Sequence, residues 1–378
     1  MKAEEEERGY QQSQDDDGLA HRLEQEVPGL AYPEMRFIAD SVILPSPSEI
    51  QVLRGHRLSV TSVALTADGR KAVSGSKDGD ILIWDLETSA KTLRLKCQRY
   101  NTVGHDYVTS IALSQDGNFL CSGGKDGRIN IWDFETGECL KTLQHEGGVT
   151  GLSVRTGHNE LFSCGNDRSV KLWTLDGFGY VDSMYGHEAP VQDVDSLARQ
   201  RAITCGGRDH TIRIWKVLED SQLVFYTEKF CWGSIDTVRL ISEDHFVAGS
   251  SSGCLSLWSV FRKSPAFVSE HAHADVDNRE GWISSLCSVQ MMALFDFGNV
   301  TKINKYWKKL NVLNRFPVVV RFAVNFRYFK TGFVNSLASA NGSLLVAGIG
   351  QEHKQGRWWN VKEAVNSVVV IPLKFNDN

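Results

Sequence analysis

One unit recurs along this chain at intervals of 41 to 51 residues, and this recurrence restricts the available folds more than any other feature. Each unit begins with two apolar residues separated by two others, as in "SVTSVAL" and "YVTSIAL". The first residues of these pairs are Val60, Val108, Val149, Val191, Ile235, Ile283 and Val334. A period of this size indicates an array of supersecondary units that bury their apolar faces against their neighbours.

A tryptophan closes each unit, and the residues before it alternate between apolar and polar, as in "DILIWD" and "RINIWD". This period of two is typical of half-buried β-strands. Turn sequences such as "TADG" and "SKDG" separate the apolar stretches. Each unit is therefore predicted to consist of several short antiparallel strands, and the fold to be all-β. The closing tryptophans are Trp84, Trp132, Trp173, Trp215, Trp258, Trp307 and Trp358.

The first four units also share a histidine, an aspartate and the tryptophan at nearly constant spacing. In the first unit the aspartate follows the histidine by 22 residues, and the tryptophan follows the aspartate by 6. A serine stands at one further shared position, at Ser74, Ser122 and Ser163. The four sets are His56, Asp78 and Trp84; His105, Asp126 and Trp132; His145, Asp167 and Trp173; and His187, Asp209 and Trp215.

With Gly-His near the start of a unit and Trp-Asp near its end, residues 48–373 resemble the WD-repeat family of β-propellers. The resemblance implies a seven-bladed propeller. It also implies that the shared histidines, aspartates, tryptophans and hydroxyls form a hydrogen-bonded network inside each blade, so that these residues are structural rather than catalytic. The segment "SEIQVLRG" is expected to add a strand to the last blade and so close the ring.

Charge divides the chain into two regions. Residues 1–50 carry 4 Lys and Arg against 12 Asp and Glu, and the rest of the chain carries 37 against 34. Residues 1–47 are predicted to be a short, acidic and largely disordered region in front of the propeller at 48–373. We find neither a secretory signal nor a run of about 18 apolar residues, so we expect an intracellular protein with no membrane contact.

The pattern weakens in the fifth and sixth units. Ala248 and Ser252 replace the hydroxyl and the aspartate of the fifth unit. The sixth unit, around 275–331, lacks the turn and the alternating strand, so a degenerate sixth blade is expected. Eight basic residues and no acidic one lie between Phe297 and Gln351, mixed with aromatic residues. This stretch is interpreted as a single-stranded RNA surface, a divergent blade with an aromatic core, or a segment foreign to the usual mature product.

Two short motifs resemble catalytic or metal-binding sites, but their positions and surroundings in the repeats do not support those roles. The sequence "GSSSG" at 249–253 matches GxSxG, but it falls in a strand-to-strand turn and not in the strand-to-helix turn of a nucleophile elbow. The "HAHAD" loop is a weak metal motif. We therefore expect no catalytic residues, no metal and no cofactor. Cys121, Cys164, Cys205 and Cys254 are expected to be buried, reduced thiols, because no CxxC pair is present.

One face of the propeller is a candidate binding surface. Lys77, Lys125 and Arg208 precede turn aspartates at its rim, and Arg168 and Arg213 lie close to them in sequence. Aromatic residues precede three of the apolar pairs, namely Tyr107, Trp282 and Phe333. Cations combined with aromatic rings suit RNA or an acidic protein surface, whereas the plainer interpretation is scattered surface lysines.

The last unit allows two interpretations. In repeat register Trp358 would end the blade, as a core residue. However, "KQGRWW" lacks the alternating apolar run, and "SVVVIPL" at 367–373 is a strand with no other role. The alternative is a loop at 351–366, inserted between two strands, that offers side chains to a partner. Its candidate contacts are His353, Lys354, Arg357, Trp358, Trp359 and Lys362.

Two stretches outside the repeat consensus, "CGGRDHTIRIWKVLEDSQLVFY" and "AGIGQEHKQGRWWNVKEAVNSVVVIPL", resemble the U3 small nucleolar RNA-interacting branch of the WD-repeat family, the 55-kilodalton type. The resemblance implies a non-enzymatic subunit in the nucleus and nucleolus. Its partners would be the box B/C region of U3 small nucleolar RNA, a small kink-turn-binding snoRNP protein and other small-subunit processome proteins. Its role would be pre-rRNA processing. The alternative is a protein–protein adaptor, such as a ubiquitin-ligase substrate receptor.

Overall fold

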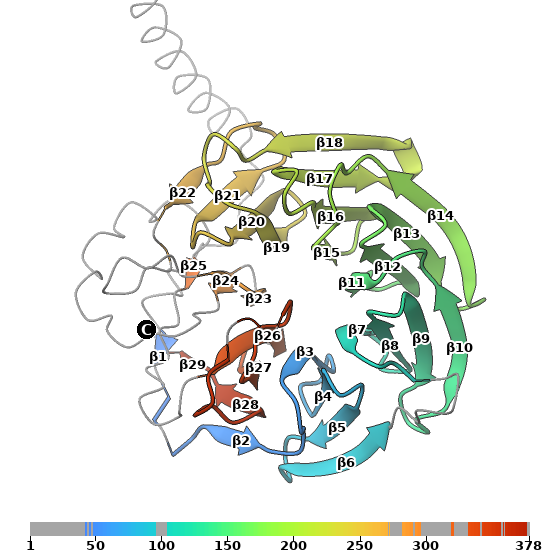
Figure 1. Cartoon of the computed structure of the whole chain (residues 1–378), viewed down its shortest axis with the longest axis vertical. Helices are drawn as coiled ribbons and strands as arrows, with labels where there is room; N and C mark the ends of the chain where they lie inside the picture. Colours follow the sequence, from blue (N-terminus) through green and yellow to red (C-terminus); the bar gives the residue numbers. More distant parts are fainter. Residues whose placement is uncertain are drawn as a thin grey trace, which may run out of the picture. The chain divides into compact units, whose positions relative to one another are not determined.

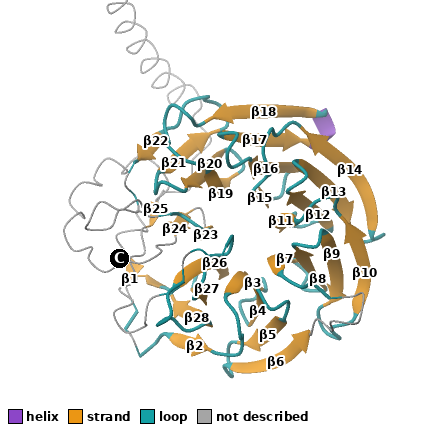
Figure 2. Cartoon of the chain, in the orientation of Figure 1, coloured by secondary structure: helices purple, strands orange, loops and turns teal. Residues whose placement is uncertain are grey.

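The described part of the chain consists of β-strands, joined by loops and turns, that surround a central opening, as Figures 1 and 2 show. This computed structural model describes residues 42–43, 45–46, 48–95, 104–270, 272, 282–289, 292–295, 319–320, 332–340, 342–356, 358 and 360–375. They belong to one unit, Ala39–Asn378. The single helix among them is a short 3-10 turn at Val217–Glu219. None of the described residues form a helix long and apolar enough to cross a membrane.

Five four-stranded antiparallel sheets, called the first to fifth blades, follow one another in chain order. The first is β3 (Val60–Leu65), β4 (Lys71–Ser76), β5 (Ile81–Asp85) and β6 (Ala90–Leu95); the second is β7 (Val108–Leu113), β8 (Phe119–Gly124), β9 (Arg128–Asp133) and β10 (Cys139–Gln144); the third is β11 (Val149–Val154), β12 (Glu160–Gly165), β13 (Ser169–Thr174) and β14 (Gly179–Tyr185). The fourth is β15 (Asp193–Ser196), β16 (Arg201–Cys205), β17 (Thr211–Lys216) and β18 (Ser221–Tyr226); the fifth is β19 (Ile235–Ser242), β20 (His245–Ser250), β21 (Leu255–Ser259) and β22 (Phe267–Ser269).

The last blade takes strands from both ends of the described chain. It contains β26 (Phe333–Ala340), β27 (Leu344–Gly350) and β28 (Ser367–Pro372), and its outer strand is β2 (Gln51–Leu53), which pairs with β28. This pairing confirms the strand expected before His56. It removes a free sheet edge, because a strand from the start of the ring completes the final sheet. A further pair, β1 (Val42–Ile43) with β29 (Lys374–Phe375), joins the same two regions, and β1 falls within residues 1–47.

Among the described residues the sixth unit forms three strands: β23 (Leu286–Val289), β24 (Met292–Phe295) and β25 (Val319–Val320), and β25 lies parallel to β24. The part of the chain that the structure describes thus contains six four-stranded blades, and the prediction of seven is corrected. The physical reason is the absence from this unit of a turn and an alternating run that would form an antiparallel third strand. Trp307 lies outside the described residues.

The core lies between neighbouring blades, because each strand has one face toward the next sheet. Val73 and Ile81 of the first blade pack with Val108, Ile111 and Leu120 of the second in one buried cluster. Hydrogen bonds near the central opening repeat between blades as well. The backbone N–H of Ile111 donates to Ser62, that of Leu152 to Ser110, that of Leu337 to Ser285 and that of Val63 to Ser336, at 3.0–3.1 Å.

The loop interpretation of the last unit is the one that the structure supports. Residues 351–366, here called the last-blade loop, connect β27 to β28. In the first blade Ala72, three residues before Gly75, pairs with Trp84. In the last blade Leu345, three residues before Gly348, pairs with Ile371. Ile371 therefore holds the blade position that a tryptophan holds elsewhere.

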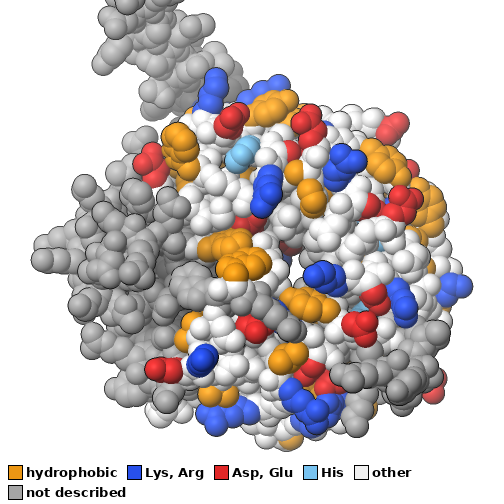
Figure 3. Space-filling model, viewed as in Figure 1, with side chains coloured by type: hydrophobic (Ala, Val, Ile, Leu, Met, Phe, Trp, Pro, Cys, Tyr) orange, Lys and Arg blue, Asp and Glu red, His pale blue; other side chains and the backbone are white. Residues whose placement is uncertain are grey.

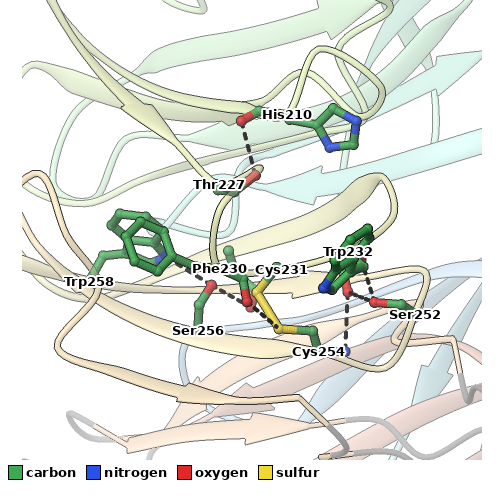
Figure 4. The surroundings of a disulfide bond; sticks show 11 residues. His210, Thr227, Phe230, Cys231, Trp232, Ser252, Cys254, Ser256 and Trp258 are labelled. Atoms are coloured by element: carbon green, nitrogen blue, oxygen red, sulfur yellow. Dashed lines mark hydrogen bonds between the residues drawn. A yellow bond between two sulfur atoms is a disulfide. The ribbon is translucent and has the colours of Figure 1, made fainter.

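The expectation of reduced thiols is wrong for one pair. Cys231 and Cys254 form a disulfide, with their Cα atoms 5.7 Å apart (Figure 4). The sequence concealed this pair because 23 residues separate the two cysteines and the fold brings them together. Cys121, Cys164 and Cys205 are buried and free, and burial raises the pKa of the first two thiols to about 12. These three thiols are therefore protonated at neutral pH.

Candidate functional site

A chain of hydrogen bonds crosses the third blade and fixes one end of its strands. Trp173 Nε1 donates to Ser163 Oγ at 2.8 Å, Ser163 Oγ lies 3.1 Å from His145 Nε2, and His145 Nδ1 lies 2.7 Å from Asp167. Because an indole N–H only donates, the protons point along this chain from the tryptophan to the carboxylate. The carboxylate accepts from the imidazole, so the network links the strand core to the turn that holds Asp167.

Burial and charge tune the ionisable groups of this network. Burial lowers the pKa of His145 below its ordinary value, and this effect exceeds the opposing attraction of Asp167. Burial acts to raise the pKa of Asp167, but the positive charge of protonated His145 and the Ser169 hydrogen bonds bring it below its ordinary value. The resting pair is a neutral imidazole and a carboxylate. The imidazole and the carboxylate both have their hydrogen-bond partners within the blade.

The second and fourth blades repeat the network with small changes. In the second blade Ser122 accepts from Trp132 and lies 2.9 Å from His105 Nε2, whose Nδ1 is 3.2 Å from Asp126. In the fourth blade Thr204 takes the place of the serine. It accepts from Trp215 at 2.8 Å and lies 2.8 Å from His187 Nε2, while His187 Nδ1 is 2.6 Å from Asp209. The spacing of the motif did not reveal that Thr204 has this role.

The first blade keeps only part of the network. Ser74 Oγ accepts from Trp84 Nε1 and lies 2.7 Å from His56 Nε2, but Asp78 accepts the backbone N–H of Arg57. His56 Nδ1 is buried and has no hydrogen-bond partner among the described residues. Burial lowers the pKa of His56 to about 4, against the attraction of Asp78. The imidazole is therefore neutral at physiological pH.

In the fifth blade the disulfide stands at the register positions of this network. Cys231 lies four residues before Ile235, as His187 lies four before Val191. Cys254 lies four before Trp258, as Thr211 lies four before Trp215, and Thr211 Oγ1 is 3.3 Å from His187 Nδ1. Ala248 offers no hydroxyl, and Trp258 Nε1 donates to Ser256 at 2.8 Å instead. A covalent bond thus joins the parts that hydrogen bonds join elsewhere.

Lys77 anchors the last-blade loop to the first blade. Its Nζ lies 3.1 Å from Glu352 Oε2, and it donates to the carbonyl oxygens of His353 at 2.7 Å and Gly356 at 2.9 Å. The Lys77 side chain is only 1 % exposed. The prediction that Lys77 is a rim cation for RNA is corrected, because its charge is turned inward and compensated by the loop.

Three aromatic residues predicted for this face also hold the loop. Tyr107 donates its hydroxyl to the carbonyl of Lys354. Trp282 stacks on the His353 ring, with ring centres 4.2 Å apart, and Phe333 meets the same ring edge-on at 5.9 Å. Across the opening, Gln355 donates to Gln192 of the fourth unit at 3.1 Å. The loop is therefore fixed to the first, second and last blades, to Trp282 of the sixth unit and to the fourth unit.

The central cavity, with a volume of about 640 Å³, lies under this loop. Lys354, Gln355 and Gly356 line it from the loop side, and Thr61, Thr109 and Thr150 line it from the inner strands. Its charged wall residues include Arg239 and Asp193, whose Nη1 and Oδ2 atoms are 3.0 Å apart. Sequence reasoning missed this pair, because Asp193 stands where the first and second units have serine. The pair balances its own charge, so these two residues leave no net charge on the wall.

Trp358 is exposed, and this decides between the two interpretations of the double tryptophan. The side chain is 67 % exposed and stacks loosely on Trp282, with ring centres 6.3 Å apart. Arg357 and Trp359 lie outside the described residues. Lys362 is exposed and Lys354 is half-buried. The described residues of the loop thus present the Trp358 ring to solvent, and hydrogen bonds from Lys77 hold the loop backbone.

The other predicted cations fall into two groups. Lys125, Arg168 and Arg208 are exposed beside the turns that carry the network aspartates. Arg213 is half-buried within β17 and donates to Gln222 on β18 at 2.9 Å, so it belongs to the fourth blade and not to the rim. On the face in Figure 3, hydrophobic side chains gather beside the central opening with Lys and Arg side chains around them. Among the described residues no cluster of three His, Cys, Asp or Glu could hold a metal.

The blades, their networks and the ring closure define a WD-repeat β-propeller. The WD domain, G-beta repeat model matches residues 47–85, 96–133, 137–174 and 179–216. The chain belongs to the WD-repeat family that includes U3 small nucleolar RNA-interacting protein 2: it is 36% identical to the human protein of that name over 392 residues, which cover 99% of this chain and 79% of that protein.

Further relatives and a solved structure agree with this assignment. An uncharacterized WD repeat-containing protein of Schizosaccharomyces pombe is 36% identical over 61% of this chain, and the match spans half of that protein's length. Ribosomal RNA-processing protein 9 of Saccharomyces cerevisiae is 26% identical over 83% of this chain and 58% of its own length. The solved structure of U3-55K superimposes with a TM-score of 0.75 at 34% identity, covering 87% of this chain and 99% of that one.

Proposed function

We propose that this chain is a non-catalytic RNA- and protein-binding subunit of the U3 small nucleolar ribonucleoprotein, acting in pre-rRNA processing for the small ribosomal subunit. The observation that carries the proposal is the similarity along 99% of the chain to U3 small nucleolar RNA-interacting protein 2. The name of the yeast relative, a ribosomal RNA-processing protein, supports the same process. The nucleus and nucleolus are the compartments that this role requires.

The surface proposed for RNA and partners is the face that carries the last-blade loop. Trp358 supplies an exposed ring for stacking, and Lys125, Arg168, Arg208, Lys354 and Lys362 supply charge for phosphate contacts. Arg357 and Trp359 remain in the proposal as neighbours of Trp358 in sequence. The box B/C region of U3 RNA, a small kink-turn-binding protein and other processome proteins are the proposed partners.

The network residues are proposed to act as framework. Their hydrogen bonds run inside the blades and end on backbone or on one another, which supports a structural role over acid–base chemistry. The protein–protein adaptor alternative rests on the propeller alone, and no observation on this chain favours it over the RNA-bound role.

The test is crosslinking and immunoprecipitation of the full chain, with sequencing of the bound RNA. Enrichment of U3 RNA is the expected result, and its absence would reject the proposal. The double variant Arg208→Glu and Lys125→Glu should reduce RNA recovery and leave the melting temperature nearly unchanged, since both side chains are exposed. An equal loss of stability would show that these two residues are structural.

A further inference from the structure

Trp232 is a second exposed tryptophan that the propeller framework does not use. It lies between β18 and β19, and its side chain is 81 % exposed. Figure 4 shows it next to the disulfide between Cys231 and Cys254. An exposed tryptophan indicates a binding site more strongly than an exposed aliphatic residue does, because tryptophan is enriched at binding hot spots.

The backbone that carries Trp232 is fixed on both sides. Cys231 is bonded to Cys254, and the carbonyl of Trp232 accepts the hydroxyl of Ser252. Beyond the tryptophan, the backbone N–H of Ser234 donates to Ser251 Oγ at 3.1 Å, and Ser251 N–H donates to the Ser234 carbonyl at 2.9 Å. The loop is therefore ordered before any partner arrives, which lowers the entropic cost of binding through Trp232.

Glycine is required immediately after the exposed ring. Gly233 has a φ of +86°, and a Cβ atom at this position would lie 2.6 Å from Ser251 Oγ. The chain can thus turn sharply against the β20–β21 turn only with glycine here. This close approach holds the backbone beside Trp232 against the β20–β21 turn.

Cationic side chains lie beside this loop. Gly207, the residue before the exposed Arg208, bridges to Ile235. Lys229 is exposed in the same loop, next to the exposed Glu228.

We propose that Trp232 is a stacking platform for an unpaired base of single-stranded RNA, with Arg208 and Lys229 contacting the adjacent phosphates. This inference rests on the proposed function and names a second contact, independent of the last-blade loop. An exposed ring flanked by Gly233, Ser251 and Ser252 suits a nucleotide, whose base offers a π-face and whose phosphate carries charge.

The experiment measures binding of the full chain to a labelled single-stranded RNA of about ten nucleotides, a length in the usual range of such sites. Fluorescence anisotropy should show that Trp232→Ala binds about tenfold more weakly, since the stacking of one base is lost. Trp232→Phe should keep most of the affinity, because phenylalanine also stacks. Phe261→Ala is the matched control: Phe261 is 78 % exposed after β21, at the opposite end of this strand from the Cys254 turn.

The outcomes separate this inference from the function on which it rests. If the wild-type chain binds the oligonucleotide and Trp232→Ala binds it equally well, the stacking role of Trp232 is overturned and the RNA-binding role stands. If the wild-type chain neither binds the oligonucleotide nor enriches U3 RNA, the proposed function itself is overturned. If Trp232→Ala keeps its RNA affinity but loses a co-purifying protein, the surface belongs to a protein partner and the inference fails. Matching melting curves show that the variants are folded.

Discussion

Lys77 and Glu352 form an ion pair of 3.1 Å across 275 residues of sequence, and it joins the first blade to the loop of the last. The pair lies where the ring closes. The lysine is almost fully buried, so its charge depends on the loop for compensation. The Lys77 ammonium group therefore helps to close the ring and also holds the loop that carries the exposed Trp358.

Removing this ammonium group should detach the loop. Lys77→Met keeps the apolar stem but leaves Glu352 and two backbone carbonyls without their donor. Breaking a buried pair in this way typically costs about 3–5 kcal/mol of folding free energy. Denaturant unfolding should show a loss of this size, and hydrogen exchange should speed up across 351–366. Lys125→Met, at an exposed position, is the control and should change neither measurement.

Truncation of an exposed loop tryptophan and of a buried blade tryptophan should change the free energy of unfolding by different amounts. Trp358→Ala should change the free energy of unfolding by less than about 0.5 kcal/mol, because the ring is exposed, while weakening RNA recovery. Trp258→Ala should cost about 3–5 kcal/mol, since Trp258 is fully buried. A loss of several kcal/mol for Trp358→Ala would return this residue to the core and contradict the loop assignment.

The Thr204 hydroxyl in the fourth-blade network should make a large contribution to the free energy of unfolding for a single small group. Thr204→Val keeps the shape but leaves both Trp215 Nε1 and His187 Nε2 without a partner. Each unsatisfied buried group costs about 1–3 kcal/mol, so a total loss of about 2–6 kcal/mol is expected in chemical denaturation. Ser256→Ala in the fifth blade removes the acceptor of Trp258 Nε1 and a long hydrogen bond of 3.5 Å to the Ala248 carbonyl, and should cost about half as much. Equal costs would argue against the two-sided role of Thr204.

Acid should weaken the anchorage of the last-blade loop through His353. Burial, with the charges of Lys354 and Lys77, lowers its pKa from an ordinary value of 6.5 to about 3. A depressed histidine pKa means that the unfolded chain binds the proton more readily. Its contribution to stability is therefore complete above pH 6.5 and is lost as the pH falls from 6.5 toward 3. The unfolding free energies of wild type and His353→Phe should be measured over this range. The wild type should lose up to about 1.4 kcal/mol relative to the variant for each pH unit of acidification, so the two values should converge at low pH.

The disulfide should be detectable and should stabilise the fifth blade. Non-reducing peptide mapping should recover Cys231 linked to Cys254, while free Cys139, which is partly exposed, is alkylated. The double variant Cys231→Ser and Cys254→Ser should lose about 3 kcal/mol, as is typical for a bridge that closes a loop of this length. Alkylation of both cysteines without a reductant would show that the link is absent.

The sequence alone determined the repeat and its strands. Apolar alternation of period two predicted the strands, because this pattern depends on local geometry. The network was implied by the family resemblance, and equal spacing did not ensure it. His56, Asp78 and Trp84 have the spacing of His145, Asp167 and Trp173, but Asp78 accepts from Arg57 and not from His56. The strand "SVVVIPL" raised the loop at 351–366 as one of two interpretations, and the pairing of β27 with β28 decided between them. The family resemblance likewise rested on local stretches, and the comparison with U3 small nucleolar RNA-interacting protein 2 bears it out.

The tertiary structure alone decided which side chains are free to bind. Lys77 and Lys125 occupy the same place in their units, yet one is buried against Glu352 and the other is exposed. The Cys231–Cys254 bond and the Asp193–Arg239 pair likewise join distant segments. Burial depends on what neighbouring blades and loops place beside a residue, and a local pattern carries no information about neighbours that are hundreds of residues away.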